Sequence, residues 1–115
     1  MNNRNSFYDI KSFYDKGALL KASYRGMRYQ VERAEDEAGQ EGGVAVKKLR
    51  VYVWPEPFCF EKTPGRFKES CDFEYSEDGL FKAYNWVCTC YDVNKEKWEH
   101  AMNFPLESAK EMGII

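Results

Sequence analysis

The chain has 115 residues, 43% of them hydrophobic, and a formal net charge of −2, which is typical of one globular domain spanning residues 1–115. This near-neutral charge excludes a global field that would attract nucleic acid or an acidic membrane. No window approaches the roughly 20 apolar residues of a membrane-spanning helix, and no apolar run of signal-peptide length follows the N-terminus. We therefore expect a single cytoplasmic domain without membrane contact.

The first predicted element is a short amphipathic helix over residues 6–16. Its apolar side chains recur at helical spacing, namely Phe7, Ile10, Phe13 and Tyr14. Ser6 is placed to cap the N-terminus of this helix, and Gly17 is placed to end it.

Residues 18–34 are predicted to form a β-hairpin. Apolar and polar residues alternate over residues 20–24 and again over residues 27–31, as in half-buried strands. Arg25 and Gly26 lie between the two runs, and glycine supplies the positive φ that a tight turn needs. The next segment, residues 34–43, has three glycines, four acidic residues and no large apolar side chain, which predicts a mobile loop.

A third strand is predicted over residues 44–54. Alternation places one set of side chains toward a core, Leu49, Val51 and Val53, and the next set on the other face, Lys48, Arg50, Tyr52 and Trp54. Pro55 and Pro57 should end the strand, because proline cannot donate to a sheet ladder. Residues 67–75, where apolar side chains alternate with acids, predict a fourth strand at an edge.

The longest predicted element is a helix over residues 77–102. Ser76 is placed to cap it, and two acids in its first turn suit the positive end of the helix dipole. An apolar stripe follows at spacings of three, four or seven residues, namely Leu80, Tyr84, Val87, Tyr91, Trp98 and Met102. Asn103-Phe104-Pro105 should end this helix, and residues 106–112 are expected to add a short helical piece.

Together these elements predict an α+β fold. An antiparallel three- to four-stranded sheet would be covered on one face by the short N-terminal helix and the long C-terminal helix. The valine-rich strand faces would be buried beneath the helices. The opposite face of the sheet would then be open to solvent.

No set of residues predicts catalysis, a metal site or a bound cofactor. Cys88 and Cys90 are a close pair, but at positions i and i+2 of a helix they point ~200° apart and cannot chelate one ion together. We expect the four cysteines to be reduced thiols that mostly pack in the core. An enzyme built on Cys59 or Cys71 with His100 stays an alternative, and it requires the thiol and the imidazole to lie together.

One surface of the predicted sheet is a candidate binding face. Cations and two aromatic rings would share its solvent side, namely Lys21, Arg28, Lys48, Arg50, Tyr52 and Trp54. This combination suits a partner protein, or stacking on bases with neutralisation of phosphates. Two alternatives stay open: a solvated face whose long side chains cover the rings, and Trp54 packed on Pro55 and Pro57.

Three segments of the sequence carry a family resemblance, namely residues 20–29 (LKASYRGMRY), 53–64 (VWPEPFCFEKTP) and 73–80 (FEYSEDGL). Together they resemble a group of small uncharacterised bacterial proteins from gram-positive gut species, which often accompany phages and integrative elements. The resemblance covers about residues 7–92 and implies no activity. The part of the sequence after Asp92 is longer than in that group.

The order of helix, strands and helix is also similar to the double-stranded RNA-binding domain. This likeness is one of topology alone. The second helix begins here with Ser76-Glu77-Asp78, where that domain has basic residues, so phosphate would be repelled at this position.

We therefore expect a non-catalytic cytosolic binding protein that acts by protein–protein interaction. The resemblance implies a phage or mobile-element origin, for example an inhibitor of a host defence system such as CRISPR. The alternative is a nucleic-acid-binding module that uses the basic aromatic sheet face. Neither function needs a cofactor, a metal or a small-molecule substrate.

Overall fold

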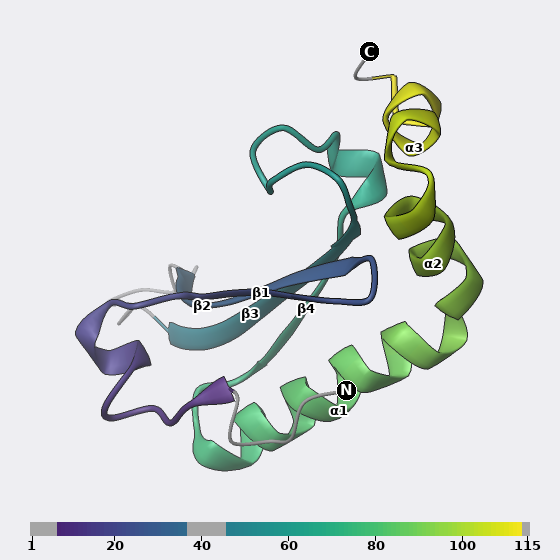
Figure 1. The fold of residues 1–115 in the computed structure, drawn as a ribbon. Coiled ribbons are helices and arrows are strands. Elements are labelled where there is room, and N and C mark those ends of the chain that lie inside the picture. The colour runs from purple at the N-terminus through teal and green to yellow at the C-terminus, as the bar shows by residue number, and fades with distance from the viewer. Residues whose placement is uncertain (1–6, 37–45, 114–115) are drawn as a thin grey trace.

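The computed structural model describes residues 7–36 and 46–113, and its strands form one antiparallel sheet in the order β1-β2-β3-β4 (Figure 1). The strands are β1 (Leu20–Tyr24), β2 (Met27–Asp36), β3 (Val46–Pro55) and β4 (Glu69–Glu74). The helices are α1 (Glu77–Val93), α2 (Lys95–Asn103) and α3 (Pro105–Glu111), and two 3-10 turns are η2 (Tyr14–Lys16) and η3 (Gly65–Phe67). The predicted α+β class with an antiparallel sheet is therefore confirmed.

The inner face of the sheet packs on α1. This helix runs across one face of the sheet, while α2 and α3 continue beyond the end of the strands, toward the connection between β3 and β4 (Figure 1). The inward side chains of β3 are fully buried as their alternation predicts, namely Leu49, Val51 and Val53. Leu80 and Val87 of α1 are also fully buried in the same core cluster.

The hairpin between β1 and β2 closes on the predicted pair of residues. Tyr24 pairs with Met27, so Arg25 and Gly26 form a two-residue turn. Both have positive φ, 46° for Arg25 and 93° for Gly26, as a type I′ hairpin turn requires. β2 then extends to Asp36, so residues 34–36 belong to a strand and the predicted start of the loop is wrong. The rest of that predicted loop, residues 37–43, lies outside the described residues.

The predicted helix over residues 6–16 is not formed among the described residues. Tyr8 has a φ of 63°, which an α-helix does not allow, and only Tyr14–Lys16 form a 3-10 turn. Phe7 and Tyr14 are nevertheless fully buried, and the Tyr14 hydroxyl donates to the Phe7 carbonyl at 2.8 Å. Burial of two rings in a compact turn therefore outweighs the weak local preference for helix. The proposed cap, Ser6, lies outside the described residues.

The predicted helix over residues 77–102 is interrupted at Asn94, where α1 ends and α2 begins. The Ser76 hydroxyl caps α1 as expected, accepting from the Gly79 N–H at 3.0 Å. The break lets Trp98 turn back toward α1, where its indole Nε1 donates to the Cys90 carbonyl at 3.1 Å. This bond satisfies a carbonyl of the last turn of α1. Trp98 is buried, whereas Met102 is 44% exposed, so the predicted stripe does not extend to Met102.

The C-terminal part of the protein follows the prediction more closely. α2 ends at Asn103, and α3 occupies Pro105–Glu111, with proline in its first turn. Within residues 7–36 and 46–113, no helix is both long enough and apolar enough to span a bilayer.

The outer face of the sheet is partly covered, so the prediction of an open face is wrong. Residues 56–68 connect β3 to β4. They fold back over the part of this face that lies near the C-terminal end of β3. They are tied to α3 by a hydrogen bond from the Ser108 hydroxyl to the Glu56 carbonyl, 3.1 Å, and by one from Arg66 to the Met112 carbonyl, 2.8 Å. α3 therefore positions this connection over the sheet.

Gly26 is the point where the hairpin turn meets α2. A Cβ atom at this position would lie 1.8 Å from the Trp98 carbonyl oxygen. The Gly26 carbonyl accepts from the Glu56 N–H at 2.9 Å, which joins the same turn to the start of the 56–68 connection. The absence of a side chain at Gly26 therefore allows three segments to meet.

We predict that Gly26→Ala destabilises the protein by about 2 to 4 kcal/mol, because alanine is strained at this φ and its methyl group would displace the backbone of α2. Gly65→Ala is the matched control, since a Cβ there meets no atom within 4 Å. Urea unfolding of both variants measures the difference. Equal stability of the two variants would contradict the close approach at Gly26.

Candidate binding site on the outer face of the sheet

The outer face is the side of the sheet turned away from α1, and strand register places all six predicted binding residues on it. Lys21 pairs with Gln30, which pairs with Tyr52, and Arg28 pairs with Trp54. The same register adds acidic side chains from β2 and β4. The outer face thus includes Lys21, Arg28, Gln30, Glu32, Lys48, Arg50, Tyr52, Trp54, Asp72 and Glu74.

The cations at one end of the outer face are opposite carboxylates. Arg50 lies between Glu32 on β2 and Asp72 on β4. Its Nε and one terminal nitrogen donate to the two Asp72 carboxylate oxygens at 2.8 and 3.0 Å. Lys48 lies opposite Glu74. Arg28 also has a carboxylate near it, since one of its terminal nitrogens lies 3.9 Å from a Glu56 carboxylate oxygen. Three of the four predicted cations therefore have negative charge beside them.

The aromatic rings of the outer face pack on one another under the 56–68 connection. The Trp54 Nε1 donates to the Phe58 carbonyl at 2.9 Å, and only 4% of Trp54 is exposed. Phe60 contacts Trp54 and Tyr52 edge to face, with ring centroids 5.5 and 4.7 Å apart. Lys68 lies on the Phe60 ring, 3.9 Å from its centroid. Trp54 is therefore buried by packing, and the residues that it contacts are Phe58 and Phe60 of the connection, whereas one alternative from the sequence placed it on Pro55 and Pro57.

The pKa of the Tyr52 hydroxyl is shifted by burial and by the charges around it. Burial is the main cause that raises the pKa of its hydroxyl, and the Glu32 carboxylate raises it further. Arg50 acts in the opposite direction. The middle of the outer face is thus an electrostatically paired cluster rather than a basic surface.

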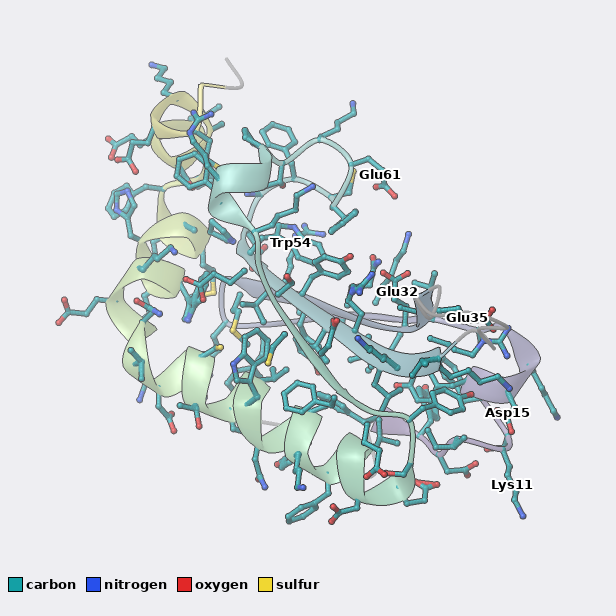
Figure 2. The ribbon with its side chains drawn as sticks, turned by 180° about the vertical axis from the view of Figure 1, so that it is seen from behind. Lys11, Asp15, Glu32, Glu35, Trp54 and Glu61 are labelled. Carbon is teal, nitrogen blue, oxygen red and sulfur yellow. The ribbon has the colours of Figure 1, made fainter. Side chains whose placement is uncertain are left out.

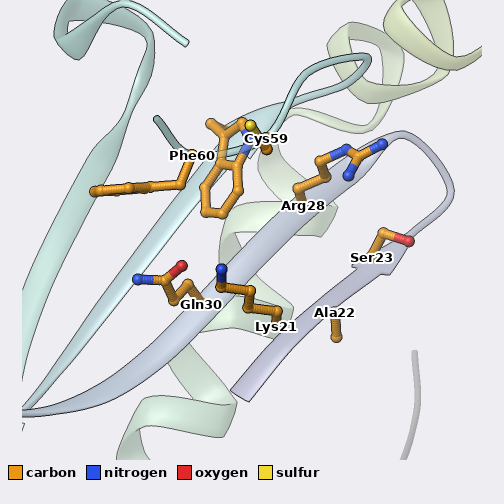
Figure 3. A pocket seen from close by; sticks show the side chains of 8 residues that line it. Lys21, Ala22, Ser23, Arg28, Gln30, Cys59 and Phe60 are labelled. Carbon is orange, nitrogen blue, oxygen red and sulfur yellow. The ribbon is translucent and has the colours of Figure 1, made fainter. Parts of the chain in front are cut away.

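A pocket of about 230 Å³ opens at the other end of the outer face, where the connection leaves the sheet (Figure 3). Its floor comes from β1 and β2 and its wall from β3 and the connection. The lining residues that carry polar groups or rings are Lys21, Ser23, Arg28, Gln30, Trp54, Cys59 and Phe60. Figure 3 shows the Lys21 ammonium beside the Gln30 amide, with Phe60 and Cys59 above them.

Two polar atoms at this pocket have no hydrogen-bond partner among the described residues. They are Gln30 Oε1 and Arg28 Nε, and both are buried. Gln30 as a whole is only 5% exposed. A terminal nitrogen of Arg28 is used elsewhere, since it donates to the Pro57 carbonyl at 3.1 Å. A buried amide oxygen without a donor costs free energy, so Gln30 Oε1 is an acceptor for which the described residues supply no donor.

A carboxylate of the protein already lies close to this pocket. The pKa of Glu61 is lowered by hydrogen bonds from its own backbone N–H and from Cys59, and further by Lys21 and Lys68. Figure 2 shows Glu61 on the connection, above Trp54. The positive charge at the pocket mouth thus favours an anionic oxygen.

A second, wider depression lies near the start of α1. Several of its polar groups are already paired: the Tyr75 hydroxyl donates to Asp15, and the Ile10 N–H donates to Glu77 at 3.1 Å. Burial raises the pKa of Tyr75 to about 12, with the Asp15 carboxylate adding to the effect. This depression therefore lacks the unpartnered groups of the pocket at Gln30.

The thiols and the imidazole are placed apart in different surroundings. The predicted core position is correct for Cys90 alone, since Cys59 is exposed at the pocket and Cys71 and Cys88 are only partly buried. Desolvation raises the pKa of Cys90 to about 11. His100 lies 3.2 Å from Glu111 and against the Phe104 ring, and it lines a small hollow with α3. Within the described ranges no three His, Cys, Asp or Glu side chains form a group able to hold a metal.

The cations of the outer face were predicted from the sequence, but the residues that set their electrostatic surroundings were not. Gln30 lies on the same face as Lys21 and Tyr52, with which it pairs, but it was not among the predicted binding residues. The alternation of β4 contained the signal for Asp72 and Glu74, because an edge strand paired with β3 must place them opposite Arg50 and Lys48. No local pattern predicts that Phe60 returns over Trp54, since that depends on the path of the connection.

No protein-family model matches this sequence, and neither the curated proteins nor the solved structures include a significant match.

We predict that Gln30→Leu stabilises the protein by about 1 kcal/mol, because leucine has a similar volume and removes a buried acceptor that lacks a donor. Urea or thermal unfolding of the two proteins measures the change. A loss of about 1 kcal/mol or more in the leucine variant would show that the amide is satisfied in the folded state, which contradicts the site described above.

Proposed function

We propose that this protein is a non-catalytic cytoplasmic binding protein that acts through protein–protein interaction, with the pocket end of the outer face as its contact surface. The observation that carries the proposal is the pocket itself. It combines an exposed cation, Lys21, with a buried ring, Trp54, and with polar atoms of Gln30 and Arg28 that have no hydrogen-bond partner among the described residues. Protein hot spots have this composition, since aromatic rings and arginine dominate them.

A protein partner is favoured over nucleic acid by the charges of the outer face. Arg50 is held by Asp72 in a two-point ion pair, and Lys48 faces Glu74. Lys21 and Arg28 are the outer-face cations that lie at the pocket. Two phosphate contacts would give a slope of only about −2 in log K against log salt, which is a small part of the electrostatic binding typical of such modules.

The rings give a second reason to favour protein. Base stacking needs an aromatic face that a nucleobase can cover. Trp54 is 4% exposed, and the Tyr52 ring is packed by Phe60. These rings can hold one side chain at the pocket, but they do not form an open stacking platform. The nucleic-acid module is therefore the second candidate.

The non-catalytic part of the proposal is supported by the separation of the reactive groups. Cys59 lines the pocket, whereas His100 lines a different hollow and pairs with Glu111. The four cysteines are free, which suits a reducing cytoplasm. A phage or mobile-element role, with inhibition of a host defence system such as CRISPR as one case, is supported by the family resemblance alone.

The test is capture of a partner from lysate of a gram-positive gut bacterium with the immobilised protein and two matched variants. Lys21→Met removes the cation at the pocket. Lys82→Met removes an exposed cation on α1, where Lys82 pairs with Asp78 at 3.2 Å. We expect a defined protein to be recovered with the parent and with Lys82→Met, to fall at least about tenfold with Lys21→Met, and to be insensitive to nuclease.

Two results would overturn this function. Equal recovery with both variants would place the contact surface elsewhere. Loss of recovery after nuclease treatment, together with retardation of single-stranded or duplex nucleic acid in a mobility-shift assay at low salt, would establish the nucleic-acid module instead.

A further inference from the structure

The pocket at Gln30 offers two cationic donors, the Ser23 hydroxyl, and a buried amide oxygen that lacks a donor among the described residues. Lys21 and Arg28 Nε are the donors that carry positive charge, and Gln30 Oε1 is the buried acceptor. A terminal nitrogen of Arg28 also lies 3.9 Å from a Glu56 carboxylate oxygen. A group that satisfies Lys21, Arg28 and Gln30 must present anionic oxygen to the cations and an N–H or O–H to Gln30. A dianionic phosphate has oxygen alone, so its approach to the Gln30 acceptor would be unfavourable.

The size of the pocket limits the ligand further. Its volume is about 230 Å³. Pockets for drug-sized metabolites are usually larger than about 300 Å³, whereas a cavity of about 150 Å³ holds a benzene ring. The space therefore suits one amino-acid side chain with its adjoining backbone. Trp54 and Phe60 provide an apolar wall for a flat side chain.

From these observations we infer that the pocket binds a peptide carboxylate next to a flat apolar side chain, with a peptide N–H donating to Gln30 Oε1. This inference rests on the proposed function and names the element of the partner that it recognises. The carboxylate comes either from the C-terminus of a polypeptide or from the side group of an Asp or Glu residue, and both supply the same charged oxygens.

Glu61 gives independent support for a carboxylate at this place. It is an exposed carboxylate of the protein on which Lys21 and Lys68 already act. Glu61 therefore experiences the same positive potential, from Lys21 and Lys68, that would attract an incoming carboxylate. A bound peptide carboxylate must compete with Glu61 for Lys21, so removal of the Glu61 charge should strengthen binding.

The test is calorimetric titration of the whole protein with four small probes. N-acetyltyrosine carries a C-terminal carboxylate, and N-acetyltyrosinamide is its neutral match. Blocked Glu-Tyr dipeptide carries the carboxylate of its glutamate, and blocked Gln-Tyr dipeptide is its neutral match. We expect one of the two acidic probes to bind with a Kd of roughly 0.1 to 1 mM. Its neutral match should bind at least about tenfold more weakly. The pair that binds identifies the source of the carboxylate.

Variants decide whether this binding uses the pocket. Lys21→Met and Gln30→Leu should each weaken the acidic probe at least about tenfold, Lys82→Met should change it less than about twofold, and Glu61→Gln should strengthen it about threefold. Gln30→Leu is informative because it should remain folded while it loses the ligand. Circular dichroism confirms the fold of each variant.

Several results would overturn the inference. Equal affinity for the acidic and neutral probes, no binding of any probe at about 10 mM, or unchanged binding by Gln30→Leu would each contradict it. Phenyl phosphate binding more tightly than the acidic probes, with the same dependence on Lys21, would assign the pocket to phosphate. If the probes fail while capture of the partner still depends on Lys21, the protein-binding function stands and only this inference fails.

Discussion

The strict alternation of β3 is the constraint on which the rest of the structure depends. One set of its side chains, Leu49, Val51 and Val53, is fully buried on the α1 side of the sheet. On the other side, Tyr52 and Trp54 meet the connection of residues 56–68. A shift of one residue in register would expose the valines and bury Arg50 without its Asp72 partner. Because both faces of β3 are covered, its alternation determines which side chains enter the core and which lie at the candidate site.

The connection of residues 56–68, which covers part of the outer face, explains why a pocket exists there. The C-terminal segment ties the connection in place, because Ser108 of α3 donates to the Glu56 carbonyl and Arg66 of the connection donates to the Met112 carbonyl just after α3. The connection in turn brings Phe60 over Trp54. That cover ends before it reaches β1, so the sheet surface at Lys21 and Gln30 is left at the bottom of a hollow. A glutamine buried at its floor without a donor is a local cost to stability. Such costs are common where a protein recognises a ligand.

The sequence predicted the elements that have strong local signals and missed those that depend on tertiary contacts. The hairpin at Arg25-Gly26, the parity of β3 and the cap at Ser76 follow from turn chemistry and alternation. The N-terminal helix and the continuous C-terminal helix were wrong, because Phe7 and Trp98 reach the core through turns that periodicity does not encode. The six predicted binding residues do share one face, but their charge environment required the register of β4.

Ligand binding in the pocket at Gln30 and Trp54 is the property on which both proposals depend. The three tryptophans of the protein allow a direct test by nuclear magnetic resonance, since each indole N–H gives its own signal. On addition of the acidic probe to ¹⁵N-labelled protein, the account predicts shifts of the Trp54 indole and Gln30 side-chain amide signals, with Trp98 unchanged because it is buried against α1. Shifts confined to Trp86 or Trp98, with Gln30 and Trp54 unmoved, would contradict it.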